Sequence, residues 1–172
     1  GLDTKANSIF SEIEKEYTNT LALAKKATSK PTVLSGAMFQ DQWYVPQGES
    51  WASLFLKDEQ SNYLWAETKG TGSLPLPFEK ILEKAQNAEY WIAPGDFSSL
   101  KQMSDSNPHY SEFASFKNKK VYSYGINKGA KGGILYFEWS PTRPDWVLKD
   151  LITIFHPELL PNHKLFFFQK LE

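Results

Sequence analysis

Short apolar segments alternate with helical segments along most of the chain, and this alternation restricts the fold more than any other feature of the sequence. The segments expected to be strands are 32–35, 62–66, 89–93, 120–124 and 165–170. Apolar residues recur at helical spacing between them, at 51–56, 78–85, 97–103, 110–116 and 143–155. Strands that alternate with helices predict an α/β fold in three layers, with a mostly parallel sheet between two layers of helices.

A long helix is expected ahead of the first strand. Its apolar residues recur at spacings of three and four: Leu2, Ala6, Ile9, Phe10, Ile13, Tyr17, Leu21 and Ala24. A helix over 2–27 would be roughly 38 Å long, which is long for a domain of this size. Pro31 follows it and disfavours its continuation. We therefore divide the chain into a connecting helix, 1–28, and an α/β unit, 29–172.

The composition argues against several classes of protein. The 172 residues contain 19 Lys and Arg against 20 Asp and Glu, so the chain lacks the basic excess typical of nucleic-acid binding. Without Cys, disulfides and thiolate metal sites are excluded. The apolar run 165–168 is far shorter than the ~18–20 residues of a membrane span. Aromatic residues make up 15% of the chain, which fits either a thick aromatic core or a site for a large flat ligand.

Ligands of parallel α/β sheets bind beyond the carboxyl ends of the strands. Four segments expected to be loops should meet at that edge: 36–49, 67–77, 94–97 and 125–133. They carry aromatic, amide and other polar side chains: Phe39, Gln40, Gln42, Trp43, Tyr44, Ser73, Asn127 and Lys128. The sequence therefore predicts a rim that is rich in rings and amides and poor in acids.

No pattern of catalytic residues is found. The Gly-rich segment 125–133 lacks the spacing of a phosphate-binding loop, and it does not follow the first strand. His109, His156 and His163 are not clustered with carboxylates in a way that predicts a metal site. A nucleophile elbow is also missing. We expect a protein that is not an enzyme, with no catalytic residues, no metal ligands and no cofactor of its own.

Glu79 has two interpretations. It stands in the first turn of an expected helix, directly after the rim segment 67–77. An acid at that position stabilises the helix through its dipole. It can also be an exposed anion that docks a basic partner, and the residues by themselves leave both interpretations open.

Several segments occur in an order typical of one family. After the long helix come PTVLSG, YVPQGESWASLFL, LPLPFEKILEKAQNAEYWI, FKNKKVYSYG and RPDWVLKDLITIFHPELLP. With these segments the chain resembles, from Leu2 to about Leu171, the carboxyl-terminal lobe of a helical-backbone (class III) periplasmic substrate-binding protein. Such proteins are the receptors of ABC importers for iron–siderophore complexes, haem and vitamin B12. The version resembled is that of the Bacteroidetes-type lipoproteins.

The resemblance implies a Rossmann-like lobe, joined through the long helix to an amino-terminal lobe that this sequence does not include. The ligand would lie between the lobes, against the segment around Trp43 and Tyr44. In the family, a glutamate of each lobe pairs with arginines of the permease, and Glu79 occupies that place. Arg143 either faces an anionic ligand or braces its own loop. The candidates for ligand binding are Phe39, Gln40, Trp43, Tyr44, Ser73, Asn127 and Arg143.

The implied function is that of a non-catalytic transport receptor, periplasmic and lipid-anchored in the full-length protein. Its partners would be a metal-chelate ligand and the transmembrane permease of an ABC importer. One alternative is an α/β enzyme or nucleotide-binding domain, which would need a motif that is not found. Another is an aromatic-lined carbohydrate-binding module, but such modules are usually all-β. The residues do not choose among siderophore, haem and cobalamin.

Overall fold

The computed structural model describes residues 2–172, and a five-stranded sheet lies at its centre. The strand order is β4-β1-β6-β7-β8. Their bounds are Asn62–Tyr63, Thr32–Ser35, Tyr90–Ile92, Val121–Ser123 and Gln169–Lys170. The first four run parallel, whereas β8 pairs antiparallel with β7 at one edge. The expected α/β fold with a mostly parallel sheet is therefore confirmed, although every strand except β1 is shorter than the apolar segment that predicted it.

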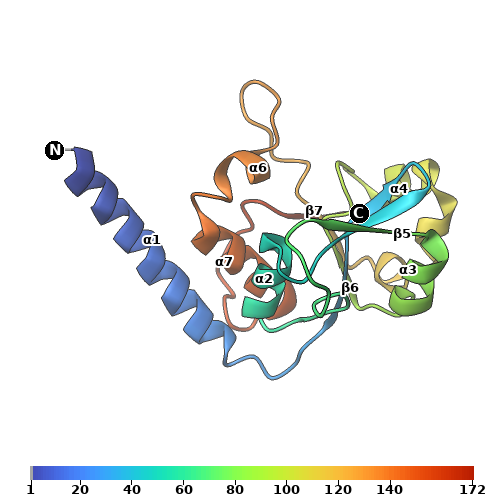
Figure 1. Cartoon of the computed structure of the whole chain (residues 1–172), viewed down its shortest axis with the longest axis horizontal. Helices are drawn as coiled ribbons and strands as arrows, with labels where there is room; N and C mark the ends of the chain where they lie inside the picture. Colours follow the sequence, from blue (N-terminus) through green and yellow to red (C-terminus); the bar gives the residue numbers. More distant parts are fainter. Residues whose placement is uncertain (1) are drawn as a thin grey trace.

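Helices cover both faces of this sheet. Figure 1 shows α2 and α7 on one side of the strands and α3 and α4 on the other. The helical segments after the first strand are α2 (Trp51–Asp58), α3 (Phe78–Ala85), α4 (Leu100–Ser106), η1 (Pro108–Glu112), α5 (Ala114–Lys117), α6 (Leu135–Trp139) and α7 (Pro144–Phe155). Ser50 caps α2 by accepting a hydrogen bond from the Ser53 N–H. The short helix α6 was not expected from the sequence.

A second, smaller sheet corrects two of the sequence expectations. Its antiparallel strands are β2 (Ala37–Phe39), β3 (Gln42–Pro46) and β5 (Ser73–Leu76), in the order β2-β3-β5. The segments 36–49 and 67–77, expected to be loops, therefore contain paired strands, at 37–39, 42–46 and 73–76. These strands could not be recognised from the sequence because they contain proline, which is disfavoured at central strand positions. Pro75 is tolerated because β5 is an edge strand that pairs with β3 alone.

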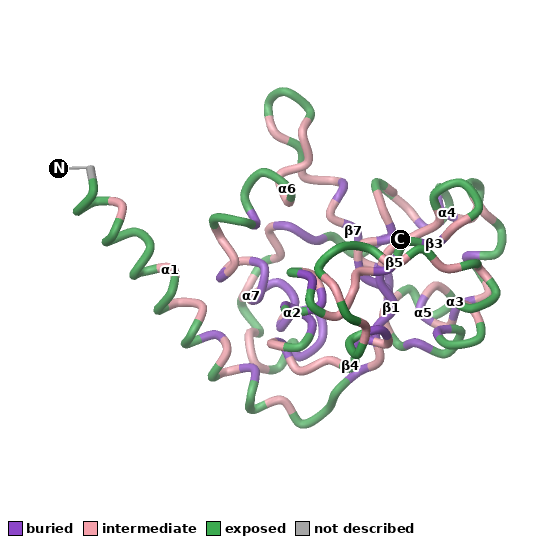
Figure 2. The backbone as a smooth tube through the Cα atoms, viewed as in Figure 1, coloured by how far each residue is buried: buried purple, intermediate pink, exposed green. Residues whose placement is uncertain are grey.

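The long helix α1 (Leu2–Ala24) is confirmed ahead of the first strand. Its carboxyl-terminal half packs against α7, where Ala24 lies buried with Leu148 and Ile152. The Tyr17 hydroxyl donates to Asp58 at 2.5 Å and fixes the helix to the end of α2. The amino-terminal half stands away from the body (Figure 2), and Phe10 there is 63% exposed. No helix within residues 2–172 is both long and apolar enough to cross a membrane.

Four aromatic residues form a cluster inside the molecule, between the main sheet, the smaller sheet and the α4–α5 region. This core cluster consists of Trp43, Trp91, Tyr110 and Phe113, all at most 2% exposed. The ring centroids of Trp43 and Trp91 are 5.1 Å apart, and those of Trp91 and Phe113 are 5.4 Å apart. A large share of the aromatic content therefore serves the core. The core cluster also joins the smaller sheet to the main one.

Candidate ligand-binding cleft

A cleft of about 660 Å³ opens beyond the carboxyl ends of β1, β6 and β7. This is the edge at which parallel α/β sheets bind their ligands. The cleft is lined by the following residues: Ser35, Gly36, Ala37, Met38, Phe39, Tyr44, Pro46, Ala52, Ser73, Ala93, Gly95, Tyr124, Tyr136 and Phe137. Its volume lies within the range of ordinary small-molecule sites.

The smaller sheet forms one wall of the cleft. Its hairpin β2–β3 brings Phe39 and Tyr44 to the opening, with their ring centroids 6.4 Å apart. The hairpin lies close to the end of β1 because Gly36 has no side chain: a Cβ there would stand 1.9 Å from the Tyr44 carbonyl oxygen. Gly36 also has a φ of 81°, which favours glycine. The residue after β1 therefore lets the hairpin fold back over the sheet edge.

The opposite wall consists of Tyr124, directly after β7, and of Tyr136 and Phe137 on α6. The rings of Tyr124 and Tyr136 stack at 4.8 Å with an interplanar angle of 11°. Phe137 meets Tyr124 edge to face at 5.1 Å and is 61% exposed. Burial raises the pKa of both tyrosine hydroxyls, and the charge of Asp96 adds to the rise for Tyr124. These phenols are therefore neutral hydrogen-bond donors at physiological pH.

The cleft lining contains no charged side chain among the residues that the structure describes. Beside it, Lys128 and Asp96 form an ion pair at 3.1 Å that joins the segments following β7 and β6. Gly125 allows this approach, since a Cβ there would lie 2.2 Å from an Asp96 carboxylate oxygen. The charges of Lys128 and Asp96, beside the cleft, therefore neutralise each other.

Three of the residues predicted to bind ligand line the cleft together: Phe39, Tyr44 and Ser73. Gln40 lies in the hairpin turn with a φ of 56°, exposed and outside the lining. Trp43 is 0% exposed in the core cluster, and its indole N–H donates to the Ser35 carbonyl at 3.1 Å. The expectation that Trp43 faces a ligand is therefore wrong. Successive side chains of a strand point to opposite faces, so Tyr44 reaches the cleft and Trp43 cannot.

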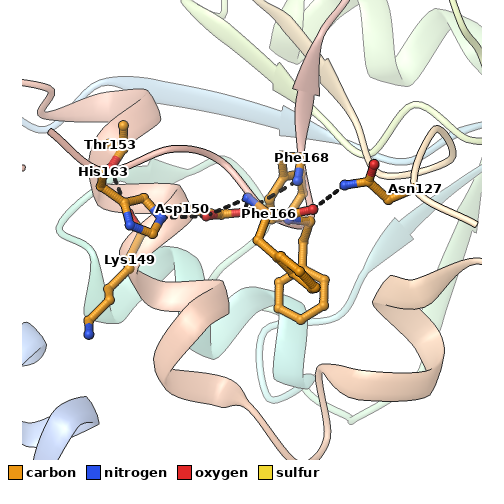
Figure 3. A network of polar contacts seen from close by, with 8 residues as sticks. Asn127, Lys149, Asp150, Thr153, His163, Phe166 and Phe168 are labelled. Atoms are coloured by element: carbon orange, nitrogen blue, oxygen red, sulfur yellow. Dashed lines mark hydrogen bonds and ion pairs between the residues drawn. The ribbon is translucent and has the colours of Figure 1, made fainter.

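Asn127 is held within a structural network instead of lining the cleft. Its side-chain amide donates to the Phe166 carbonyl (Figure 3). The buried Asp150 accepts from the Phe166 N–H at 2.9 Å and from His163 at 2.7 Å. Asp150 also accepts from the Phe167 N–H at 2.6 Å. This network fixes the chain before β8 and ties the Gly-rich segment 125–133 to it.

Arg143 braces its own helix. Its guanidinium donates two hydrogen bonds to the fully buried Asp145, at 2.9 and 2.6 Å. It also lies 3.7 Å from the ring centre of Trp146. A guanidinium engaged in this way is not free for an anionic ligand, and Arg143 does not line the cleft. Of the two roles expected for this residue, the structure shows the bracing one.

Glu79 is exposed in the first turn of α3, directly after β5. It forms no ion pair with any residue that the structure describes. Strand β5 connects this helix start to the cleft, because Ser73 at the other end of the strand belongs to the lining. The carboxylate is therefore presented to solvent outside the cleft.

Among the cleft residues that sequence reasoning missed are four with large side chains: Met38, Tyr124, Tyr136 and Phe137. Tyr124 was the last residue of an expected strand, so its position at a carboxyl end was a usable signal. Met38 could not be placed while its segment was taken for a loop. Tyr136 and Phe137 lie on a helix of only five residues, too short for a periodic pattern.

A second hollow of about 660 Å³ lies between α1 and α2. It is lined mainly by apolar side chains, among them Phe10, Ile13, Trp51 and Leu54. The Tyr17 hydroxyl in this groove is already bonded to Asp58. None of the groove's lining residues directly follows a strand of the main sheet, so the cleft is the better candidate for a ligand. Within residues 2–172, no three His, Asp or Glu side chains are grouped so that they could hold a metal ion.

The sheet order and the two helical layers match the fold of a lobe of a TroA-like periplasmic binding protein. Solved structures of this class share the fold. The TroA-like periplasmic binding protein FepB of Veillonella parvula covers 94% of the chain with 56% of its own length, at a TM-score of 0.65 and 17% identity. IsdE of S. aureus, solved in complex with heme, covers 89% with 58% of its length, at a TM-score of 0.61 and 17% identity.

A third solved structure is a possible iron-binding (periplasmic solute-binding) protein of Staphylococcus epidermidis. It covers 89% of the chain with 55% of its own length, at a TM-score of 0.64 and 15% identity. Identities this low show the fold and nothing finer. The chain thus has the α/β fold of a TroA-like periplasmic binding protein lobe. Two of these three structures are named as periplasmic binding or solute-binding proteins.

Two curated proteins of Methanocaldococcus jannaschii match in sequence. An uncharacterized lipoprotein is 29% identical over 160 residues, which cover 91% of this chain and 37% of the relative. A second uncharacterized protein is 22% identical over 162 residues, which cover 92% of this chain and 46% of the relative. The chain thus spans less than half the length of either relative. No family model matches it.

Proposed function

We propose that this chain is the carboxyl-terminal lobe of the substrate-binding component of an ABC importer, of the Bacteroidetes type. The complete receptor captures an iron complex (siderophore or haem) or cobalamin between two lobes and delivers it to the membrane permease. The observation that carries the proposal is the cleft at the carboxyl ends of β1, β6 and β7, which has aromatic walls and no charged residue in the described part of its lining. It presents half of a binding surface for a large organic chelate.

The chemistry of the lining supports a chelate over a bare metal ion. An ion bound directly would need several oxygen or nitrogen ligands, usually including carboxylates or imidazoles. The described lining offers rings, a thioether and hydroxyl groups. Rings give a large contact area at a low entropic cost, which suits a ligand with broad organic faces.

The similar proteins agree with this proposal. Their printed names include an iron-binding solute-binding protein and a protein solved with heme. One sequence relative is a lipoprotein, which supports a location outside the cytoplasm and a lipid anchor in the full-length protein. Both sequence relatives are more than twice as long as the matched region, which leaves room for a second lobe.

Glu79 is proposed to dock the receptor on its permease. We expect Glu79→Arg in the complete receptor to abolish ligand uptake, while the ligand affinity stays within about threefold of wild type. The reason is that an exposed charge outside the cleft affects docking on a partner more than it affects ligand binding in the cleft. Uptake by cells and affinity of the purified receptor measure the two effects separately. Glu83→Arg, an exposed site on the same helix, is the matched control. Loss of ligand affinity in Glu79→Arg would refute the docking role.

The ligand itself is identified by titrating the complete receptor with haem, cyanocobalamin and a panel of ferric siderophores, followed by tryptophan fluorescence. Saturable quenching by one chelate, with micromolar or tighter affinity, is the expected result. Absence of binding across the panel would contradict the proposed function, although the fold would stand.

A further inference from the structure

The polar atoms of the core cluster bind one short segment of main chain, residues 35–38. The Trp43 indole N–H donates to the Ser35 carbonyl at 3.1 Å, and the Trp91 indole N–H donates to the Gly36 carbonyl at 2.8 Å. Both carbonyls belong to residues that line the cleft. The buried rings therefore hold the main chain at the point where it leaves β1 and enters the wall of the cleft.

Tyr110 makes a third bond to this segment, and it comes from a distant part of the chain. Its hydroxyl oxygen accepts from the Met38 N–H at 3.2 Å. Tyr110 belongs to η1, is 72 residues away from Met38 along the chain and is only 2% exposed. Met38 lies in β2 and lines the cleft. This bond therefore joins the α4–α5 region to the β2–β3 wall.

Strand β2 depends on this bond because the strand is short and lies at an edge. It has three residues and, in the smaller sheet, it pairs with β3 alone. The Met38 N–H is bonded to Tyr110, so it is directed away from β3. If the hydroxyl were removed, this half-buried N–H would lose its partner, which costs free energy unless the strand moves or water enters. The hydroxyl therefore fixes the position of β2.

The position of β2 in turn decides where Phe39 stands at the opening of the cleft. Phe39 is the last residue of β2 and is 66% exposed, so its place is set mainly by the backbone that carries it. Phe137 stands on the opposite wall. A ligand that contacts both walls binds best when their separation is already fixed, because ordering a loose wall on binding costs free energy.

We infer that Tyr110 is a positioning residue for the cleft: its hydroxyl fixes β2, and β2 holds Phe39 in place for ligand binding. The inference rests on the proposed function and deepens it, because it gives a buried residue outside the lining a part in ligand affinity. The hydroxyl is the group that matters for this role. A phenylalanine at this position removes that group and keeps the ring that packs against Trp43 and Trp91.

Tyr110→Phe in the complete receptor tests the hydroxyl. The probe is the chelate among haem, cyanocobalamin and the ferric siderophores that quenches the wild-type fluorescence. We expect the variant to bind this probe about threefold to tenfold more weakly, the usual value of one hydrogen bond. Hydrogen exchange measured by mass spectrometry should also become faster in the segment 36–44, since β2 is held less firmly.

Tyr17→Phe is the matched control. It also removes a hydroxyl hydrogen bond, the one to Asp58 at 2.5 Å, but Tyr17 lines the groove between α1 and α2 and not the cleft. This variant should change neither the affinity for the probe nor the hydrogen exchange of the segment 36–44. Equal losses of affinity in Tyr17→Phe and Tyr110→Phe would overturn the inference.

A double-mutant cycle separates positioning from a general loss of stability. In a Phe39→Ala background, Tyr110→Phe should weaken binding by less than about twofold, because the ring that it positions is gone. In a Phe137→Ala background, which alters the opposite wall, it should keep its full effect of about threefold to tenfold. A general loss of stability would act equally in both backgrounds, and that result would overturn the inference.

The same measurements separate this inference from the proposed function. If the wild-type receptor binds a chelate and Tyr110→Phe binds it equally well, the inference is overturned and the receptor function stands, even where hydrogen exchange has become faster. Absence of binding by the wild type to every chelate would contradict the receptor function itself and, with it, the role of Tyr110 in ligand binding.

Discussion

Two aromatic clusters serve different purposes in this protein. The core cluster is sealed: Trp43 and Trp91 are both 0% exposed, and their indole N–H groups donate to the carbonyls of Ser35 and Gly36. The cleft walls are open: Phe39 is 66% exposed and Phe137 is 61% exposed. Aromatic content by itself therefore does not indicate a ligand site. Exposure at the carboxyl edge of the sheet separates the two clusters.

The largest expected effect breaks the core cluster. Trp43→Ala should lower the free energy of unfolding by about 3–5 kcal/mol, because it removes a large buried ring and leaves a cavity. Urea denaturation followed by circular dichroism measures this loss. The neighbouring Tyr44→Ala is the matched comparison on the opposite face of the same strand. It should cost less than about 1.5 kcal/mol of stability and weaken ligand binding by about 1–3 kcal/mol. The reverse pattern would contradict the assignment of the two faces.

A smaller effect, on the pH dependence of stability, is expected from a buried pair of titratable side chains that lies in the core and not in the cleft. Glu59 and His156 are 0% and 1% exposed, and Glu59 Oε2 lies 3.6 Å from His156 Nε2. Burial raises the pKa of Glu59 well above 4.5, although hydrogen bonding from Ser61 opposes the rise. Burial also lowers the pKa of His156 below 6.5, although the charge of Glu158 opposes this shift. These shifts favour the neutral form of both side chains inside the folded protein.

The sign of the pH dependence follows from the proton balance. A carboxyl group with a raised pKa in the folded state contributes stability below its unfolded pKa, and this contribution is lost as the pH rises through the folded pKa. Above pH 4.5, Glu59→Gln should therefore gain stability relative to wild type, by up to about 1.4 kcal/mol per pH unit. His156 is present in both proteins, so its opposite contribution largely cancels.

Urea denaturation at a series of pH values between 4 and 8 measures this difference. Glu49→Gln is the control: the Gly70 N–H lowers the pKa of that exposed carboxyl, so its small effect should have the opposite sign. A difference between Glu59→Gln and wild type that stays constant with pH would show that Glu59 is ionised in the folded protein.

The main sheet could be predicted from the sequence because the apolar segments 32–35, 89–93 and 120–124 are separated by helices, and only a parallel sheet accommodates that order. The smaller sheet could not be predicted, because Pro46 and Pro75 lie within its strands. That error had a consequence for the site. Without a strand at 42–46, the alternation that separates Trp43 from Tyr44 was lost.

The polar candidates failed for a different reason. Asn127 and Arg143 lie near the expected rim in sequence, but their partners, the Phe166 carbonyl and Asp145, occupy their hydrogen-bonding groups. Partners that are distant along the chain, such as Phe166, cannot be found from the local sequence. The position of Glu79 at the start of a helix was predicted correctly, because Pro77 and the apolar spacing after it mark that start in the local sequence. Its docking role stays a prediction.

The central claim is that the ligand binds in the cleft, and not in the equally large groove between α1 and α2. The most direct test compares the affinity of the complete receptor for its chelate in Phe137→Ala and in Phe10→Ala. Both rings are exposed, one at the cleft and one at the groove. We predict that Phe137→Ala weakens binding by about 1–3 kcal/mol while Phe10→Ala leaves it unchanged. Weaker binding in Phe10→Ala alone would contradict the account and place the ligand in the groove.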